Sequence, residues 1–437
     1  MLTSLKNAFK VKEIRSKLLF TLAMLVVIRL GSQLPVPGVD RTYFAQWFAA
    51  QTGDAFSFFD AITGGSFLNM SILALNINPY ITSSIIMQLL TIAIPALEEM
   101  QRDGEDGRKK IASITRYVTV LLALIQASAM AIGFGNQGLL VEFNAMNVIT
   151  CIVALTAGSA FLMWIGERIT ENGIGNGISI VLVINIISRL PQDLGALFQQ
   201  FVFGKPYATA ILAAILIFAI IILMVVLVII LNAGVRRIPV QYAKKVQGRK
   251  MVGGQTSNIP LKVNTSGVIP VIFASSLMQT PIIVCSLLGV QGTGVWGEIL
   301  KGLNSGNWCK PSQPIYSLGL IVYILLVIFF AYFYTSVTFN PMMVADNMKK
   351  AGGFIPGIRP GKPTSDYLTK VLNYVIFIGA VGLLIIAVLP FVFNGLFNAS
   401  VSFAGTSLII IVSVILETMK QVESMMLVRN YKGFLND

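Results

Sequence analysis

The chain has 437 residues, of which 55% are hydrophobic and only 12% are charged. Soluble domains carry about 25% charged residues, so this composition excludes an ordinary soluble protein and indicates one embedded in a membrane. The formal net charge is +13, but the basic residues alternate with long apolar runs, which argues against a nucleic-acid-binding domain.

Apolar segments long enough to cross the hydrocarbon of a membrane follow one another along the chain. We place them at 18–34, 71–95 (broken), 117–134, 147–165, 178–200, 208–231, 268–290, 315–337, 371–393 and 401–419. The fifth is the least regular, because Arg189, Pro191 and Asp193 interrupt it. We therefore predict an all-α polytopic membrane protein with ten transmembrane helices.

Lysine and arginine are distributed unevenly between the two sides of these spans. Of the 32 basic residues, 26 fall in the segments that would lie inside, five, including Arg189, in the outer loops, and Arg29 in the first span. By the positive-inside rule, this asymmetry predicts that both termini are cytoplasmic. The largest cytoplasmic loops, 232–267 and 338–370, mix basic residues with Gly, Pro and aromatics. They are either solvated topological anchors or docking surfaces for a large or acidic partner.

The chain offers little chemistry for catalysis or for binding metal. It has no His and only three Cys without paired spacing, so we expect no metal site, no cofactor and no enzymatic activity. The glycine-rich stretch "ENGIGNGISI" (Glu171 to Ile180) lacks the lysine of a phosphate-binding loop. We predict that it forms a tight turn between two spans, with Asn176 capping the following helix.

Ion-coupled transporters usually bury carboxylates or His at the middle of the membrane. We predict none in the spans of this chain, where Arg29 is the only mid-span charge. We expect Arg29 to extend toward the membrane surface or to pair with backbone carbonyls, in preference to the alternative of a gating role. A secondary transporter with inverted repeats and broken helices stays an alternative function, which small-solute uptake would favour.

Five stretches of the chain, in this order, match one known family. They are "IRLGSQLPVPGVD" (Ile28 to Asp40), "NPYITSSIIMQLL" (Asn78 to Leu90), "MWIGERITENGIGNGISI" (Met163 to Ile180), "PLKVNTSGVIPVIFASS" (Pro260 to Ser276) and "GIRPGKPT" (Gly357 to Thr364). Over essentially its whole length the chain resembles the SecY family, the channel-forming subunits of the bacterial Sec protein translocon. The resemblance implies two inverted halves of five spans around a central pore, with a re-entrant plug helix. The halves would be 1–200, with the plug at about 56–69, and 201–437, with both large loops.

The resemblance also assigns roles to particular residues. The pore ring would comprise Ile77, Ile81, Ile178, Leu182, Ile272 and Ile410. The plug would include Phe58, Phe59, Ile62, Gly64 and Gly65, and the lateral gate Thr82, Ile85, Ser275 and Ser276. Docking of a motor or a ribosome would involve Arg236, Arg237, Lys244, Lys245, Arg249, Lys250 and Arg359. We expect the plug glycines to lower helix stability by about 1 kcal/mol each, as suits a segment that leaves its seat.

The function that the resemblance implies is that of a protein-conducting channel. It would pass unfolded secretory polypeptides across the bacterial inner membrane and release membrane segments laterally into lipid. The expected partners are the SecE and SecG subunits, the SecA motor ATPase, the ribosome, signal-bearing precursor polypeptides and membrane lipid.

Overall fold

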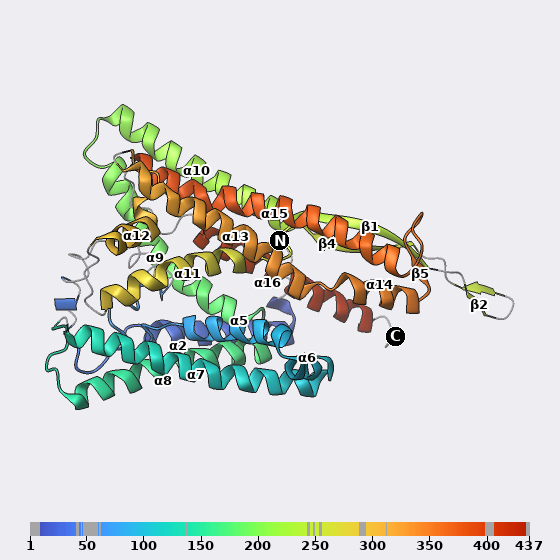
Figure 1. Ribbon diagram of the computed structural model, residues 1–437, viewed down its shortest axis with the longest axis horizontal. Coiled ribbons are helices and arrows are strands. Elements are labelled where there is room, and N and C mark those ends of the chain that lie inside the picture. Colours follow the sequence, from blue (N-terminus) through green and yellow to red (C-terminus); the bar gives the residue numbers. More distant parts are fainter. Residues whose placement is uncertain are drawn as a thin grey trace.

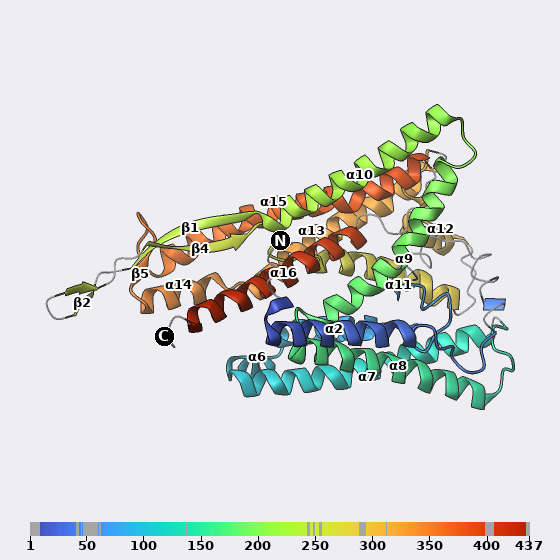
Figure 2. The same cartoon turned by 180° about the vertical axis from the view of Figure 1, so that it is seen from behind.

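The structure is a computed structural model, mostly helical, drawn from two sides in Figures 1 and 2. It describes residues 9–40, 43–44, 46, 60, 63–136, 138–242, 245–247, 250–252, 256–287, 294–311, 313–397 and 406–433. The plug residues Phe58, Phe59 and Ile62 and the docking residues Lys244 and Arg249 lie outside these ranges.

Each predicted span overlaps a helix of the described chain. In chain order these helices are α2 (Lys12–Gly31), α5 (Asn78–Ala93), α7 (Glu105–Asn136), α8 (Ala145–Asn172), α9 (Gly177–Phe201), α10 (Tyr207–Ala233), α11 (Ile269–Leu287), α13 (Leu318–Thr338), α15 (Lys362–Phe397) and α16 (Thr406–Gly433). Among the described residues, six helical segments are long and apolar enough to cross a membrane. A seventh qualifies if α5 and α6 (Pro95–Arg102), bent by 106°, count as one broken span. The chain is thus a multi-pass membrane protein, and the number ten stays a prediction.

Helix α9 shows how a span with polar interruptions is formed. It runs without a break from Gly177 to Phe201, with Pro191 inside it. As predicted, the Asn176 side chain caps its start, accepting hydrogen bonds from the backbone N–H groups of Ile178 and Ser179 at 3.1 and 3.4 Å. The assignment of Arg189 to an outer loop was wrong, because this residue lies within the helix.

The helices form two groups, joined along a central seam (Figures 1 and 2). One group contains α2, α5, α7 and α8, and the other contains α10, α13 and α15. The helices α9, α11 and α16 lie between them, where α9 packs against α16 and α11 against α7.

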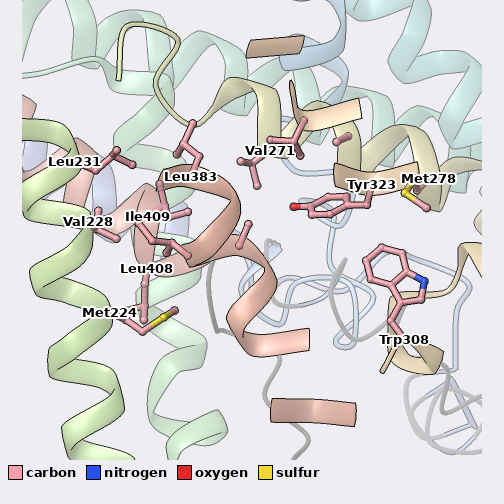
Figure 3. Packing of buried hydrophobic residues seen from close by; sticks show 14 residues of the cluster. Met224, Val228, Leu231, Val271, Met278, Trp308, Tyr323, Leu383, Leu408 and Ile409 are labelled. Carbon is pink, nitrogen blue, oxygen red and sulfur yellow. The ribbon is translucent and has the colours of Figure 1, made fainter. Parts of the chain in front are cut away.

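Each group has its own core. The first surrounds Phe44, Phe67 and Phe134, whose rings pack with the centroids of Phe44 and Phe134 5.2 Å apart. The second is shown in Figure 3, where Met224, Val228 and Leu231 of α10 face Leu408 and Ile409 of α16. On its other side Trp308, from the segment before α13, packs against Tyr323 with ring centroids 5.5 Å apart. The Trp308 indole also donates a hydrogen bond to the Gly302 carbonyl, at 2.8 Å, at the end of the short helix α12 (Val295–Leu303).

The loop predicted at 232–267 is a β-hairpin, which the all-α prediction missed. Strand β1 (Val235–Tyr242) pairs antiparallel with β4 (Thr256–Lys262), and β5 (Gly353–Phe354) pairs with the end of β1. Residues in strands alternate between faces. Ile238 and Val240 point inward, to the core formed with α14 (Pro341–Lys350) and α15, while Arg236 and Arg237 are exposed. The strands β2 (Lys245–Gln247) and β3 (Lys250–Val252) extend the hairpin.

Candidate channel site

The six residues predicted to form a pore ring meet in one hydrophobic cluster. Ile77, Leu182 and Ile410 are buried members of this cluster, and Ile81, Ile178 and Ile272 are partly buried against it. They come from the starts of four helices: Ile77 caps α5, and the others lie in the first two turns of α5, α9, α11 and α16. The structure thus brings together residues that are far apart in the sequence.

A glycine on α8 allows two of these side chains to approach. A Cβ atom at Gly166 would lie 3.3 Å from Ile178 Cγ1 and 3.5 Å from Ile77 Cδ1. Both isoleucines therefore pack over the bare backbone of α8. That these six residues line a pore stays a prediction. A narrow apolar ring of this kind would exclude water, so that ions would meet a desolvation barrier, while its flexible side chains could yield to a polypeptide. We call these six residues the apolar ring.

A polar network adjoins the apolar ring, and sequence reasoning did not predict it. Asn185 of α9 donates a hydrogen bond to the side chain of Asn76 at 3.0 Å, and Ser159 of α8 donates to the Asn76 carbonyl at 3.1 Å. Asn76 immediately precedes Ile77 and has a φ of 54°, a left-handed conformation that Asn tolerates better than most residues. These bonds fix the break that precedes α5 and so position Ile77.

Arg29 belongs to the same network. Its guanidinium donates to the Gly64 carbonyl and to the Asn185 side chain, both at 3.3 Å. The expectation that Arg29 pairs with a backbone carbonyl is therefore confirmed.

The described part of the bundle buries two carboxylates that sequence reasoning did not predict to be buried. Asp60 is fully buried, and Asp193 is 7% exposed. Both are paired with Arg189 of α9: Asp60 forms an ion pair with its guanidinium, and Asp193 lies 3.5 Å from its Nε atom. The signal that could have revealed the local part of this cluster is the i, i+4 spacing of Arg189 and Asp193 on one helix. The pairing with Asp60 joins distant parts of the chain and had no such signal.

The plug glycines have a different structural reason from the one predicted. Residues 64–70 form turns, and Gly64 and Gly65 have φ angles of +66° and +80°, which glycine adopts without strain. A Cβ atom at Gly64 would lie 2.5 Å from the Asn185 carbonyl oxygen, whereas one at Gly65 would meet nothing within 4 Å. The interpretation through helix propensity was therefore wrong for these two positions, which serve a turn and a close contact.

The predicted lateral-gate residues lie on α5 and α11. Thr82 and Ser276 are exposed and Ile85 is half-buried, while the buried Ser275 hydroxyl donates to the Val271 carbonyl at 2.9 Å. Helix α11 packs against α7 of the first helix group. A lateral opening between α5 and α11 stays a prediction.

The basic docking residues lie toward the end of the bundle that carries the β-strands. Arg236 and Arg237 are exposed on β1, and Arg359 is exposed in the turn between β5 and α15. The Arg359 carbonyl accepts a hydrogen bond from the Thr364 hydroxyl at 2.8 Å, which holds this turn against the start of α15. Lys245 and Lys250 lie on β2 and β3.

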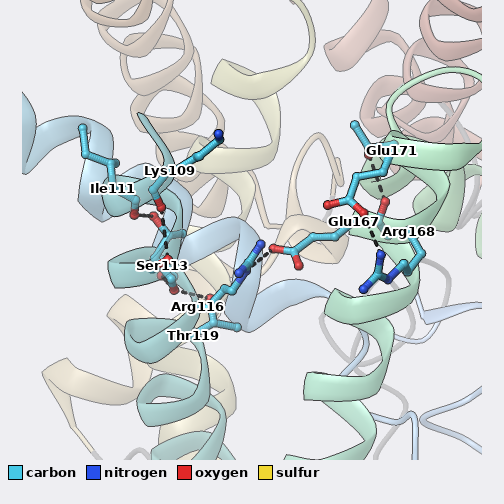
Figure 4. Close-up of polar contacts among 12 residues, drawn as sticks. Lys109, Ile111, Ser113, Arg116, Thr119, Glu167, Arg168 and Glu171 are labelled. Atoms are coloured by element: carbon cyan, nitrogen blue, oxygen red, sulfur yellow. Dashed lines mark hydrogen bonds and ion pairs between the residues drawn. The ribbon is translucent and has the colours of Figure 1, made fainter. Parts of the chain in front are cut away.

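An ion pair links α7 and α8 (Figure 4). Arg116 Nε lies 2.7 Å from Glu167 Oε1, and one residue on, Arg168 pairs with Glu171 at 2.9 Å and lies over the Trp164 ring. The Arg116 side chain is 45% exposed, so water weakens its interaction with Glu167.

We therefore expect a small effect from removing the Arg116–Glu167 pair. The substitution Glu167→Gln should lower the free energy of unfolding by about 0.2–1 kcal/mol, the range of exposed ion pairs. Thermal denaturation in detergent micelles measures it. A loss of several kcal/mol would contradict the view that apolar packing, and not this pair, joins the two helices.

Comparisons with known proteins agree with this geometry. The family model described as SecY matches residues 71–419. The chain is 43% identical to the protein translocase subunit SecY of Streptomyces galbus, with both chains fully covered. It is 42% identical to the SecY subunit of Halalkalibacterium halodurans, again over the full length of both. This chain belongs to the SecY family.

Solved structures show the same fold at lower sequence identity. A structure described as that of a protein-conducting channel has a TM-score of 0.63 at 20% identity, covering 94% of this chain and 92% of its own. A SecY structure, whose plug domain is described as stabilising the closed state, has a TM-score of 0.62 at 19% identity, with the same coverage. A Sec61 channel from a canine ribosome–channel complex has a TM-score of 0.61 at 18% identity.

Membership of the SecY family decides between the functions left open by the sequence. The family is that of a channel subunit of the protein translocase and not of an enzyme. It supports the protein-conducting channel and gives no support to the secondary transporter.

Proposed function

We propose that the apolar ring is the closed constriction through which this SecY-family channel passes unfolded secretory polypeptides. The observation that carries the proposal is that six apolar side chains from four helices meet at the seam between the two helix groups. A seam can part while each group keeps its own core. Parting it on one side would let a membrane segment move from the pore into lipid, between α5 and α11, near Thr82 and Ser276.

Two polar networks support an inverted repeat of the two halves, 1–200 and 201–437. In the first half, α2, the residue before α5, and α9 are joined through Arg29, Asn76 and Asn185. In the second half, α10, the segment before α11, and α16 are joined through Asn232, Asn264 and Ser413, with hydrogen bonds of 2.7 and 2.8 Å. Each network thus connects the first span, the start of the second and the last span of its half. Their equivalence is what a duplicated five-helix unit would retain.

The basic segments favour one orientation in the membrane. The hairpin of β1 and β4, helix α14 and helix α6 lie toward the same end of the bundle in both views (Figures 1 and 2). We assign this end to the cytoplasm of a bacterial cell, with both chain termini inside and the bundle in the inner membrane. Exposed arginines there would meet the SecA motor or the phosphates of a ribosome. SecE and SecG are the expected subunits of the complex.

Arg359 is the residue we propose to couple the channel to the motor. The substitution Arg359→Glu reverses the charge of an exposed turn, so we expect motor-driven translocation to fall about tenfold or more through repulsion at the docking surface. The measurement is SecA-dependent and ATP-dependent transport of a precursor into proteoliposomes. The matched control is Lys301→Glu, the same charge change at an exposed residue of α12, which lies at the opposite end of the bundle. Normal transport by the Arg359 variant would remove the coupling role.

One reconstitution tests the proposed function as a whole. The full chain, with SecE and SecG, is placed in vesicles and supplied with a signal-bearing precursor, with and without SecA and ATP. We expect the precursor to become protected from external protease only when motor and ATP are both present. Protection that does not depend on the channel would contradict the proposal.

A further inference from the structure

We propose that Asp60 and Arg189 form a latch that holds the closed state of the channel by fixing the turn before α5 to helix α9. The inference rests on the proposed function and names the residues that resist opening. The latched segment is defined here as Asp60 and Thr63–Ser66, and the residues that follow it belong to the first core.

Asp60 is placed to do two things at once. Its carboxylate accepts a hydrogen bond from the Leu68 N–H at 2.7 Å, and its carbonyl accepts one from the Gly65 N–H at 3.1 Å, so it closes the turn. The same carboxylate is ion-paired with Arg189 of α9. One buried side chain therefore both shapes the segment and fixes it to the helix that carries Ile178 and Leu182 of the apolar ring.

Further bonds tie the same segment to its surroundings. The Gly64 carbonyl accepts from the Arg29 guanidinium of α2 at 3.3 Å and from the Ser188 hydroxyl of α9 at 3.4 Å. These contacts are long, so each is weak by itself. Together they show that the segment is attached mainly through polar groups, in contrast to Phe67 and Met70, which are 3% and 0% exposed in the first core. The boundary between a movable and a fixed part thus lies at Phe67.

The charges of the cluster balance. Arg29 and Arg189 contribute two positive charges, and Asp60 and Asp193 contribute two negative charges. Asp60 is fully buried, and the Arg189 side chain is 15% exposed. Removing one partner of a buried ion pair leaves an uncompensated charge in a dry environment, which is strongly destabilising.

A buried ion pair is suited to a two-state closure. In a dry interior its attraction is strong, but water that enters with a polypeptide screens it and solvates both ions separately. Breaking the latch therefore becomes easier once opening has begun. The apolar ring alone would yield gradually, whereas the ring with the latch would remain closed until a client displaces the segment.

The test measures potassium chloride conductance of the full channel complex in planar bilayers, without motor or precursor. We expect Asp60→Asn and Arg189→Gln each to raise the conductance by about tenfold or more, because each removes the buried ion pair that fixes the segment to α9. The double variant should leak about as much as the worse single variant, because the coupled pair is lost only once. The double variant removes the charges of both Asp60 and Arg189, so neither is left without the other. It can therefore be measured even if a single variant fails to fold. The matched control is Glu298→Gln, which breaks the exposed Glu298–Lys301 pair of α12 and should not change the conductance.

A second measurement reports the position of the segment itself. Ser66 is 2% exposed, so a cysteine placed there, with the three native cysteines replaced by alanine, should react slowly with a membrane-impermeant maleimide. We expect Asp60→Asn to raise the labelling rate by about tenfold or more, in step with the conductance.

The outcomes separate the latch from the proposed function. If the Asp60 and Arg189 variants keep the wild-type conductance and labelling rate while still transporting a precursor with SecA and ATP, the latch is overturned and the channel function stands. If the unaltered complex transports no precursor, the proposed function itself fails.

Discussion

Replacing Ile410 by asparagine should make the closed channel leak ions. Ile410 is 3% exposed in the cluster that contains the whole apolar ring. A buried amide without partners costs about 1–3 kcal/mol, and the lost apolar burial adds about 1.5–3 kcal/mol. Both costs fall on the closed state, because in the open state water solvates the amide. Since about 1.4 kcal/mol corresponds to a factor of ten, the smaller of these sums already predicts that the ratio of open to closed channels rises by about a hundredfold or more.

Conductance of the complex in planar bilayers measures this leak in the absence of precursor. The matched control is Ile415→Asn on the same helix α16, where the native side chain is 48% exposed and lies outside the ring. Equal conductance of the Ile410 variant and the wild type would show that the ring does not seal the channel. A leak of the same size from the Ile415 variant would attribute the effect to helix α16 as a whole.

Features that depend on local periodicity were predictable from the sequence. A long apolar run such as Ala208–Leu231 predicts a span because each helical residue adds a fixed rise, and the structure has α10 at Tyr207–Ala233. The Asn176 cap is local in the same sense, since the side chain needs only the next two backbone N–H groups. The fold was predicted from the stretches that resemble the SecY family, and the family membership of the chain confirms that resemblance.

The hairpin of β1 and β4 was missed although its sequence contains the necessary alternation. In "VRRIPVQY" the inward residues Ile238 and Val240 are two positions apart, as a strand requires. Arg237 lies on the other face and the adjacent Arg236 is exposed as well, so the two arginines gave the segment the composition of a solvated loop. The alternation of a strand was therefore present in the sequence, but the charge of the neighbouring arginines made its two-residue period hard to recognise.

The polar cluster around Arg189 could not have been predicted from local pattern. The local sequence around an aspartate such as Asp60 does not indicate whether its carboxylate is solvated or paired with a guanidinium in the folded chain. Burial of an ion pair is decided by which distant segments pack together. The positions of Arg29, Asp60 and Arg189 were visible, but only the fold brings them within reach of each other.

The contact between Gly64 and α9 provides a second large effect that can be separated from the charges. Gly64 has a φ of +66°, so alanine there adopts a left-handed conformation at a cost of about 1–2 kcal/mol. Its Cβ atom would also lie 2.5 Å from the Asn185 carbonyl oxygen, an approach that real Cβ atoms do not make, so the turn must move away from α9. Gly64→Ala should therefore unseat the turn and raise the closed-channel conductance by about tenfold or more.

Gly65→Ala is the control that isolates this contact. Gly65 has a φ of +80°, so alanine there carries a similar conformational cost, but its Cβ atom would meet nothing within 4 Å. We expect the left-handed backbone conformation to destabilise the Gly65 variant by about as much as it destabilises the Gly64 variant. The Gly65 variant should nevertheless conduct far fewer ions than the Gly64 variant. Similar conductance of the two would mean that backbone strain alone opens the channel. A large difference would show that close packing of the turn on α9 keeps the channel closed, whether or not the Asp60–Arg189 pair contributes.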